Sequence, residues 1–165
     1  MGFATHLGPW LLGTVKDTTG TTAGTIRNIG ATVVSQSGTV GVANTSAITL
    51  CVLPAGAQII NIVCDVTTAF AGTTGNTITV QTAGGTSLVT FGSATTTPLA
   101  LGRNATVFTS SAGAVAAMIN VGSTDLILQV IYACAGTASG GAATVTVNYA
   151  VRGSDGAANP TVFTA

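Results

Sequence analysis

The chain has 165 residues, of which 47% are hydrophobic and only 5% are charged, and its formal net charge at pH 7 is zero. An average soluble protein is about 25% charged, so this chain lacks the mixed charged coat that keeps monomers soluble and apart. Net neutrality also argues against nucleic acid as a partner, because phosphate binding needs clustered lysine and arginine. We therefore expect other subunits to cover much of the surface.

The residue types favour strands over helices. Glutamate is absent and Lys16 is the only lysine, whereas Thr, Val, Gly and Ala are abundant. Soluble helices normally carry Glu, Lys, Gln and Arg on their surface, and β-branched residues fit pleated sheets. The length suits one domain with its own core. The composition predicts a single all-β domain.

The first part of the chain is expected to be an extended N-terminal arm, residues 1–23. Its apolar residues are followed by a run of Gly and Thr that has no periodic apolar face. Large apolar side chains are concentrated here, in a chain whose residues are otherwise small, and tryptophan is a preferred interface anchor. The expected contacts with a capsid or a neighbouring subunit are Phe3, Leu7, Trp10, Leu11 and Leu12. The alternative is that the arm folds back and caps its own domain.

A β-sandwich body is expected over residues 24–152, in which the first possible strand, 25–36, is interrupted at Gly30. Ile48, Leu50 and Val52 share a face before a turn at Pro54. The next strand spans 58–68. Ile60, Ile62, Cys64 and Val66 are expected on one face of it. Ile59 and Val63 make the other face partly apolar, as for a strand covered on both faces.

Shorter segments follow. Strands are predicted at 77–82 and 87–91, and weaker candidates lie at 98–101 and 105–108. The period of 114–121 fits either a helical turn or a strand. Residues 126–134 alternate clearly, and so do 144–151, with a loose hairpin loop expected between them at 136–142. About eight strands with this turn spacing predict a jelly-roll-like β-sandwich, followed by a C-terminal tail at 153–165.

The sequence offers little chemistry for catalysis. His6 is the only histidine and lies in the arm, where no rigid support for a catalytic pair is evident. Cys51, Cys64 and Cys134 lie in apolar stretches and are expected to be inert core thiols. The alternative is a disulfide between two of them, and no Cys-x-x-Cys spacing indicates a metal site. Asp65 is expected to accept hydrogen bonds at a strand edge or interface, and Asp125 to accept backbone N–H groups at a turn. We expect no enzyme activity, cofactor or metal.

Binding sites of other kinds are also poorly supported. Tyr132 and Tyr149 fall on alternating apolar faces and are expected in the core rather than on a binding surface. Gly84-Gly85 and Gly140-Gly141 lack the lysine of a phosphate-binding loop. The uncharged stretch between Arg27 and Asp65 is broken by polar residues and proline, so it predicts no membrane helix and no membrane partner.

Several phrases of the sequence resemble small virion proteins of tailed bacteriophages, especially marine and cyanobacterial ones. They are MGFATHLGPWLLGTVK at 1–16 and IRNIGATVVSQ at 26–36. The phrases LPAGA at 53–57 and DVTTAF at 65–70 are similar to the sandwich body of phage capsid decoration, or cement, proteins. The resemblance covers about two-thirds of the chain.

The resemblance implies a homotrimer of jelly-roll subunits bound to the major capsid protein on the head surface of a virion, after synthesis in the host cytoplasm. It also implies that the arm reaches under or between capsid subunits. Few charged side chains are available, so the contact with the capsid would be largely apolar and made through the backbone. The alternative function is a head-fibre or receptor- and glycan-binding module of the same kind of particle.

Overall fold

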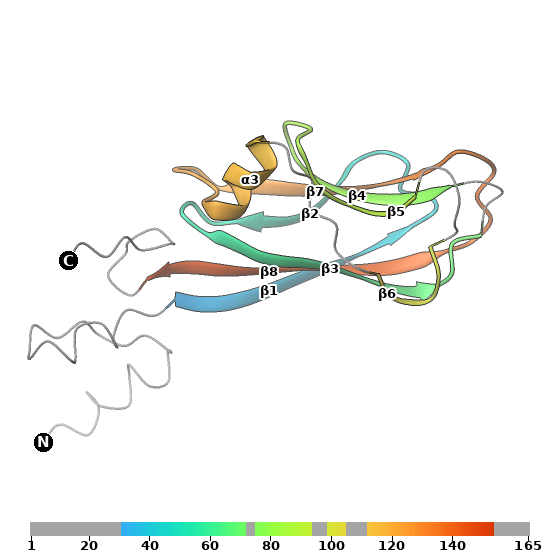
Figure 1. Ribbon diagram of the computed structural model, residues 1–165, viewed down its shortest axis with the longest axis horizontal. Helices are drawn as coiled ribbons and strands as arrows, with labels where there is room; N and C mark the ends of the chain where they lie inside the picture. Colours follow the sequence, from blue (N-terminus) through green and yellow to red (C-terminus); the bar gives the residue numbers. More distant parts are fainter. Residues whose placement is uncertain (1–30, 72–74, 94–98, 105–111, 154–165) are drawn as a thin grey trace, which may run out of the picture.

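The computed structural model describes residues 31–71, 75–93, 99–104 and 112–153. In this part of the chain, two four-stranded antiparallel sheets pack face to face, and one short helix lies at one end (Figure 1). The elements are β1 Ala31–Gly41, β2 Ile48–Leu53, β3 Gln58–Thr68, β4 Asn76–Thr82, β5 Ser87–Ser93, β6 Gly102–Asn104, α3 Ala112–Ile119, β7 Leu126–Cys134 and β8 Ala142–Gly153. The predicted arm, 1–23, and the tail from residue 154 lie outside the described residues.

The strand order is that of a jelly roll. One sheet runs β1-β8-β3-β6 and the other runs β2-β7-β4-β5. The antiparallel pairs β1–β8, β2–β7, β3–β6 and β4–β5 nest inside one another along the chain, as in one long hairpin that has been rolled up. The pairs β3–β8 and β4–β7 then join these four hairpin pairs into the two four-stranded sheets. The predicted jelly-roll-like β-sandwich is confirmed.

The core lies between the sheets and follows the period-2 pattern of the strands. β7 buries Leu128, Val130 and Tyr132, as its alternation predicts. β8 likewise buries Val145, Val147 and Tyr149, so both tyrosines are core residues. The largest fully buried side chains of the described residues are Tyr132, Phe70, Phe91, Leu53, Ile62, Ile78, Leu88, Leu99, Leu128, Val40, Val80 and Val89.

β-Bulges overturn the predicted faces of two strands. In β3 the pairing with β8 shifts between Ile59 and Asn61, so Ile59 is only 5% exposed whereas Ile60 is 49% exposed. In β2 the pairing shifts between Thr49 and Cys51, which leaves Val52 exposed. One extra residue moves the following side chains to the opposite face. The predicted grouping of Ile60 with Ile62, Cys64 and Val66 on one face is therefore wrong, and so is that of Val52 with Ile48 and Leu50.

The expected hairpin at 136–142 is also wrong, because β7 and β8 belong to different sheets and do not pair. The loop instead crosses from one sheet to the other. Ser139 N–H donates to the carbonyl of Ala71 at 2.8 Å, and Ala71 N–H donates to that of Gly140 at 3.3 Å. Alternation within a strand shows which of its residues share a face, but it does not show which other strand pairs with it.

The observed bounds of several other elements differ from the predicted ones by a few residues. β1 continues to Gly41, beyond the expected end at Gln36. The ambiguous segment after residue 112 is the helix α3, whose Ala114 is buried. β6 forms just after the weak candidate at 98–101, and the candidate at 105–108 lies outside the described residues. Among the described residues, no helix is long and apolar enough to cross a bilayer.

Candidate interaction surface

The exterior of the sandwich is hydrated mainly by hydroxyl and amide groups. Ser35 and Asn61 are joined through Asn148, whose amide accepts from Ser35 and donates to Asn61 across β1, β8 and β3. On the other sheet, the hydroxyls of Thr79 and Thr90 are 3.2 Å apart. Such groups bind water but do not repel another copy of the chain, so they leave the surface open to association.

An exposed ion pair joins β3 to the short edge strand β6. Arg103 Nε and Nη2 donate to the two carboxylate oxygens of Asp65 at 2.8 and 2.9 Å. The hydrogen bond from Arg103 lowers the pKa of Asp65 below its usual range. Asp65 is a hydrogen-bond acceptor, but it lies on the inner strand β3 and not at the edge of the sheet. Arg103 lies directly opposite it in the strand register, on the edge strand β6.

Asp125 has the predicted turn role, because its Oδ1 accepts the N–H of Ala55 at 3.0 Å. This bond ties the start of β7 to the turn between β2 and β3. Neither aspartate is part of a metal-ligand cluster: within the described residues, no group of three or more His, Cys, Asp or Glu side chains lies together.

The cysteines behave as core residues rather than nucleophiles. Cys51 and Cys64 are buried free thiols, and Cys134 has intermediate exposure. Burial raises the pKa of Cys51 to about 11. Burial, with a smaller contribution from the charge of Asp65, raises the pKa of Cys64 to about 12. Both thiols are protonated at neutral pH, and the thiolate is the reactive form.

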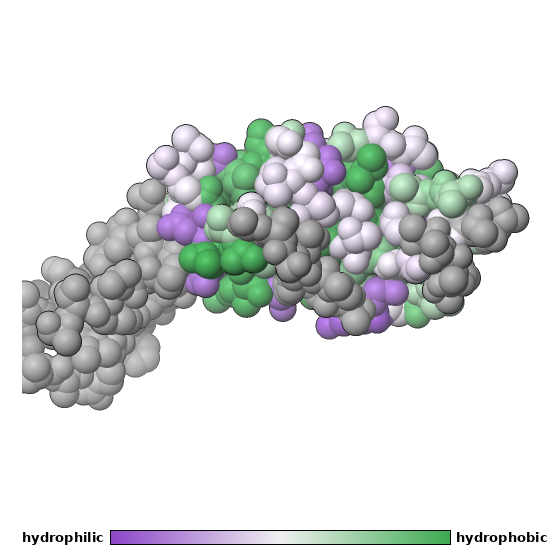
Figure 2. All heavy atoms as spheres, turned by 45° about the horizontal axis from the view of Figure 1, so that its top comes forward, coloured by the Kyte–Doolittle hydropathy of each residue, from purple (hydrophilic) through white to green (hydrophobic). Residues whose placement is uncertain are grey.

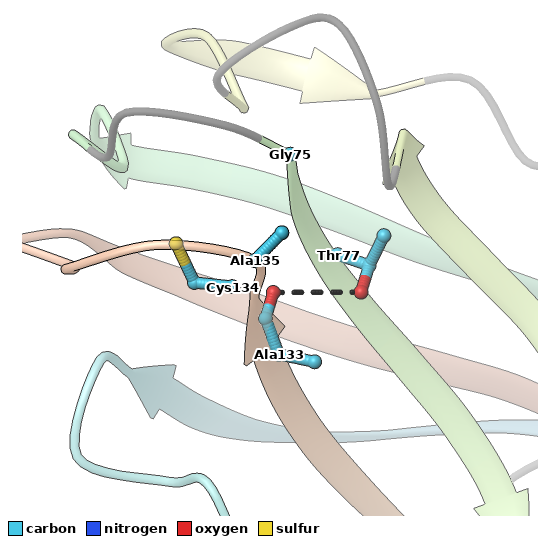
Figure 3. Close-up of a pocket in the computed structure, with 5 residues that line it drawn as sticks. All are labelled: Gly75, Thr77, Ala133, Cys134 and Ala135. Atoms are coloured by element: carbon cyan, nitrogen blue, oxygen red, sulfur yellow. Dashed lines mark hydrogen bonds between the residues drawn. The ribbon is translucent and has the colours of Figure 1, made fainter.

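A shallow cavity of about 220 Å³ lies where β4 and β7 meet, and Gly75, Thr77, Ala133, Cys134 and Ala135 line it (Figure 3). Thr77 Oγ1 donates to the carbonyl of Ala133 at 3.5 Å across this surface. The lining holds no charged side chain and no aromatic ring. It offers neither acid–base chemistry nor a flat stacking surface for a sugar.

A buried polar pair lies beneath this region. Tyr132 donates its hydroxyl hydrogen to Asn76 Oδ1, and its ring stacks on Phe70 with centroids 5.0 Å apart. Burial raises the pKa of Tyr132 to about 12. Asn76 is fully buried, and its Nδ2 group has no hydrogen-bond partner among the described residues. The pair fixes the ends of β4 and β7 from inside the core.

The edge strands are unusually bare of charge. β1, β6, β2 and β5 are the outermost strands of the two sheets. Of these four, only β6 carries a charged residue, Arg103. β1 alone has eleven residues with no charge and no proline. Soluble proteins usually protect such edges with lysine, proline or a cover, so these edges are suited to contact with another chain.

Exposed apolar side chains concentrate at one end of the sandwich. We name this the α3 end: it holds α3, the start of β1, the β2–β3 turn, the start of β7 and the end of β8 (Figure 1). Six of the seven exposed large hydrophobic residues of the described chain belong to elements at this end, and only Leu101 lies at the other. The six are Val33, Val52, Ile60, Val115, Ile119 and Ile127.

The residues predicted to make contacts, Phe3, Leu7, Trp10, Leu11 and Leu12, lie outside the described residues, as does His6. Sequence reasoning missed the α3 end because bulges expose Val52 and Ile60, and because the period of α3 was ambiguous. Ile127 did give a signal, since it lies opposite the apolar face of its strand.

No protein-family profile matches the sequence, and no curated protein matches it. Two solved structures overlap with the fold. The acidic stable capsid structure of the Helicobacter pylori bacteriophage KHP30 gives a TM-score of 0.48 at 12% identity, over 72% of this chain and 86% of that one. The cyanophage Pam1 capsid asymmetric unit gives 0.44 at 22% identity, over 73% and 86%. Both scores are below 0.5 and both identities below 25%, so these similarities assign neither a family nor a function to this chain.

Proposed function

We propose that the chain is a non-enzymatic structural protein of a bacteriophage virion, a decoration or cement protein. In this proposal it binds the major capsid protein on the outer head surface as a homotrimer and stabilises the shell. The N-terminal arm makes the shell or subunit contact through Phe3, Leu7, Trp10, Leu11 and Leu12. The phrases that resemble phage virion proteins supply the identity of the particle.

The observation that carries the proposal is the lack of charge on the edges of the sandwich. A chain with four basic and four acidic residues has little with which to protect four edge strands. Closed symmetry or a covering partner removes free edges without any charged residue. A trimer seated on a shell provides both, and the jelly roll supplies a rigid body for it.

The first test is the mass of the purified protein in solution, together with its binding to particles that lack it. We expect three copies per assembly. We also expect binding to particles that hardly weakens from low to high salt, because few charges are available to be screened. A stable monomer at all concentrations, or binding that falls steeply with added salt, would contradict the proposal.

The second test removes the arm. Deletion of residues 1–23 should release the protein from particles while the sandwich still unfolds cooperatively, because the jelly-roll core is built from later residues. Normal decoration by the truncated protein would show that the arm is not the contact. If the truncated and full chains both bind a glycan and neither binds the shell, the fibre or receptor-binding function is the better one.

A further inference from the structure

The six exposed apolar residues of the α3 end form three pairs around that end. Val52 and Ile127 are direct register partners on β2 and β7. Val115 and Ile119 are four residues apart on α3 and so lie on the same helix face. Val33 and Ile60 flank the last part of β8, since Val33 pairs with Ala150 and Ile60 follows the partner of Tyr149.

Hydrophobic residues gather toward this end on the face seen in Figure 2. Val33 is 60% exposed, and the other five are between 41% and 51% exposed. Among the described side chains, Asp125 is the one charged group at this end, and it already accepts the N–H of Ala55. The Asp65–Arg103 pair lies toward the opposite end, on β6. The α3 end thus presents six exposed apolar side chains and one described carboxylate, which suits an apolar occupant.

Of the uncharged segments outside the described residues, the one at 3–12 carries the most large apolar side chains. Residues 3–12 contain Phe3, Leu7, Trp10, Leu11 and Leu12 and no Asp, Glu, Lys or Arg. The segment joins the sandwich through residues 13–30, which lead directly into β1 at the α3 end. Val33, a member of the apolar end, is three residues past this junction.

The length of the connection suits a contact within one chain. Residues 13–30 are 18 residues rich in Gly and Thr. A flexible chain of that length has an r.m.s. span of about 5–6 Å × √18, or about 23 Å. Two sheets about 10 Å apart, each of four strands about 4.8 Å apart, give an end of comparable width. Such a match gives an effective concentration in the millimolar range, which a second copy in dilute solution does not reach.

We propose that the apolar segment at residues 3–12 docks on the α3 end of its own sandwich, with Val115, Ile119 and Ile60 at the centre of the seat. Docking covers the apolar side chains of the segment at 3–12 and those of the α3 end at once. This inference concerns the free protein and does not depend on the proposed role on a shell. A shell or a neighbouring subunit would take the arm only after it leaves this end.

Trp10 is the only tryptophan of the chain, so its fluorescence reports on the arm alone. In the full-length protein we expect blue-shifted emission that is poorly quenched by acrylamide. The double variant Val115→Asp/Ile119→Asp should shift the emission to the red and raise the quenching constant several-fold. The matched control is Leu101→Asp, which places a carboxylate on the exposed apolar residue of the opposite end and should leave Trp10 unchanged.

The sandwich must remain folded for this comparison, and cooperative urea unfolding followed by far-UV circular dichroism checks it. The milder pair Val115→Ser/Ile119→Ser replaces the double variant if the latter unfolds. The proposal would be overturned if Trp10 were already exposed in the full-length protein. It would also be overturned if the emission of Trp10 stayed the same in both double variants, or if Leu101→Asp changed that emission as much as they do.

A cross-linking experiment separates the same chain from a second copy. In a Cys134→Ala background, Leu11→Cys and Ile119→Cys are placed either on one chain or on two chains that are then mixed. Oxidation should link the two cysteines within the doubly substituted chain, and should give no covalent dimer in the mixture. Efficient dimers in the mixture would show exchange of arms between copies and overturn docking on the same chain. Neither readout uses particles, so failure to bind a shell leaves this result unaffected.

Discussion

Gly92 and Gly85 have almost the same backbone conformation but very different surroundings. Their φ angles are +86° and +85°, in the region that disfavours side chains. A Cβ atom at Gly92 would lie 2.2 Å from the carbonyl oxygen of Asn76 and 3.0 Å from Leu99 Cγ. A Cβ atom at Gly85 would meet nothing within 4 Å. Substituting Gly85 and Gly92 in turn therefore separates the cost of backbone strain from the cost of overpacking.

We expect Gly85→Ala to cost about 1–2 kcal/mol from the positive φ alone. Gly92→Ala should cost roughly 1–3 kcal/mol more, because a backbone oxygen cannot move aside as a flexible side chain can. Urea unfolding of the two variants measures the difference. Equal losses of stability would mean that β5 and β4 are not packed as closely at Gly92 as their register requires.

The buried thiols make stability dependent on alkaline pH. An unfolded cysteine loses its proton near the usual value of 9.0, whereas the pKa of Cys64 in the folded protein is about 12. Between these values the unfolded state binds fewer protons than the folded state, so the free energy of unfolding falls as pH rises. Cys51, with a pKa of about 11, acts in the same direction.

We expect Cys64→Ala to flatten the decline of stability between about pH 9 and pH 12, where one pKa unit corresponds to about 1.4 kcal/mol. Ile62→Val is the control, since it trims a buried side chain on the same face of β3 without removing a titratable group. Denaturant unfolding at several pH values provides the measurement. The same pH slope in Cys64→Ala and the wild type would show that the thiol is not desolvated in the fold.

At the scale of the element, the bulges decide which residues of a strand face the core. Alternation in the sequence puts Ile60 with Ile62 and Cys64, and the shift between Ile59 and Asn61 exchanges Ile59 for Ile60. The cause is tertiary, because the extra residue of β3 appears only when β3 pairs with β8. A period-2 pattern read on one strand has no access to that pairing.

Substituting the two adjacent isoleucines tests the bulge. Ile59→Thr should cost about 2 kcal/mol or more, because it removes buried apolar contacts and buries a hydroxyl. Ile60→Thr should change stability by no more than about 0.5 kcal/mol, as is usual for an exposed strand position. Thermal or urea unfolding compares them. The reverse order of the two losses would support the unbulged register instead.

At the scale of the whole molecule, the shortage of charge governs association. β1 is a long edge strand whose Ser37 and Thr39 are exposed. Lysines at an edge normally prevent pairing with another chain, because the ammonium groups must stay hydrated and repel each other. Lysines introduced at Ser37 and Thr39 should therefore disassemble the proposed oligomer without changing the core.

We expect Ser37→Lys/Thr39→Lys to weaken the association of copies, measured by sedimentation over a range of concentrations, with little loss of stability. The control Thr137→Lys/Ser139→Lys adds the same charge in the loop between β7 and β8. Association that is weakened equally by both would indicate general repulsion. Association unaffected by either would place the contact away from the β1 edge.

The class of the fold and much of the core follow from the residue types and their spacing along the chain. Strict alternation in the strands that became β7 and β8 identified their buried residues, because a residue's face is a local property of a strand. Composition gave the all-β class, since good surface helix formers are scarce. The roles of Asp125 and of the two tyrosines also followed from local context. The arm contacts at residues 3–12 stay a prediction.

The pairing of the strands, the positions of the bulges and the exposed apolar residues of the α3 end depend on contacts between distant segments. The partners of β8 are β3 and β1, and β1 lies more than a hundred residues earlier, so adjacency in sequence suggested a hairpin that does not form. Val52 and Ile60 became exposed through pairing, and Asp65 met Arg103 through the register of β6. Faces are set by neighbours along the chain, whereas partners and surfaces are set by contacts between distant segments, and these are absent from any local pattern.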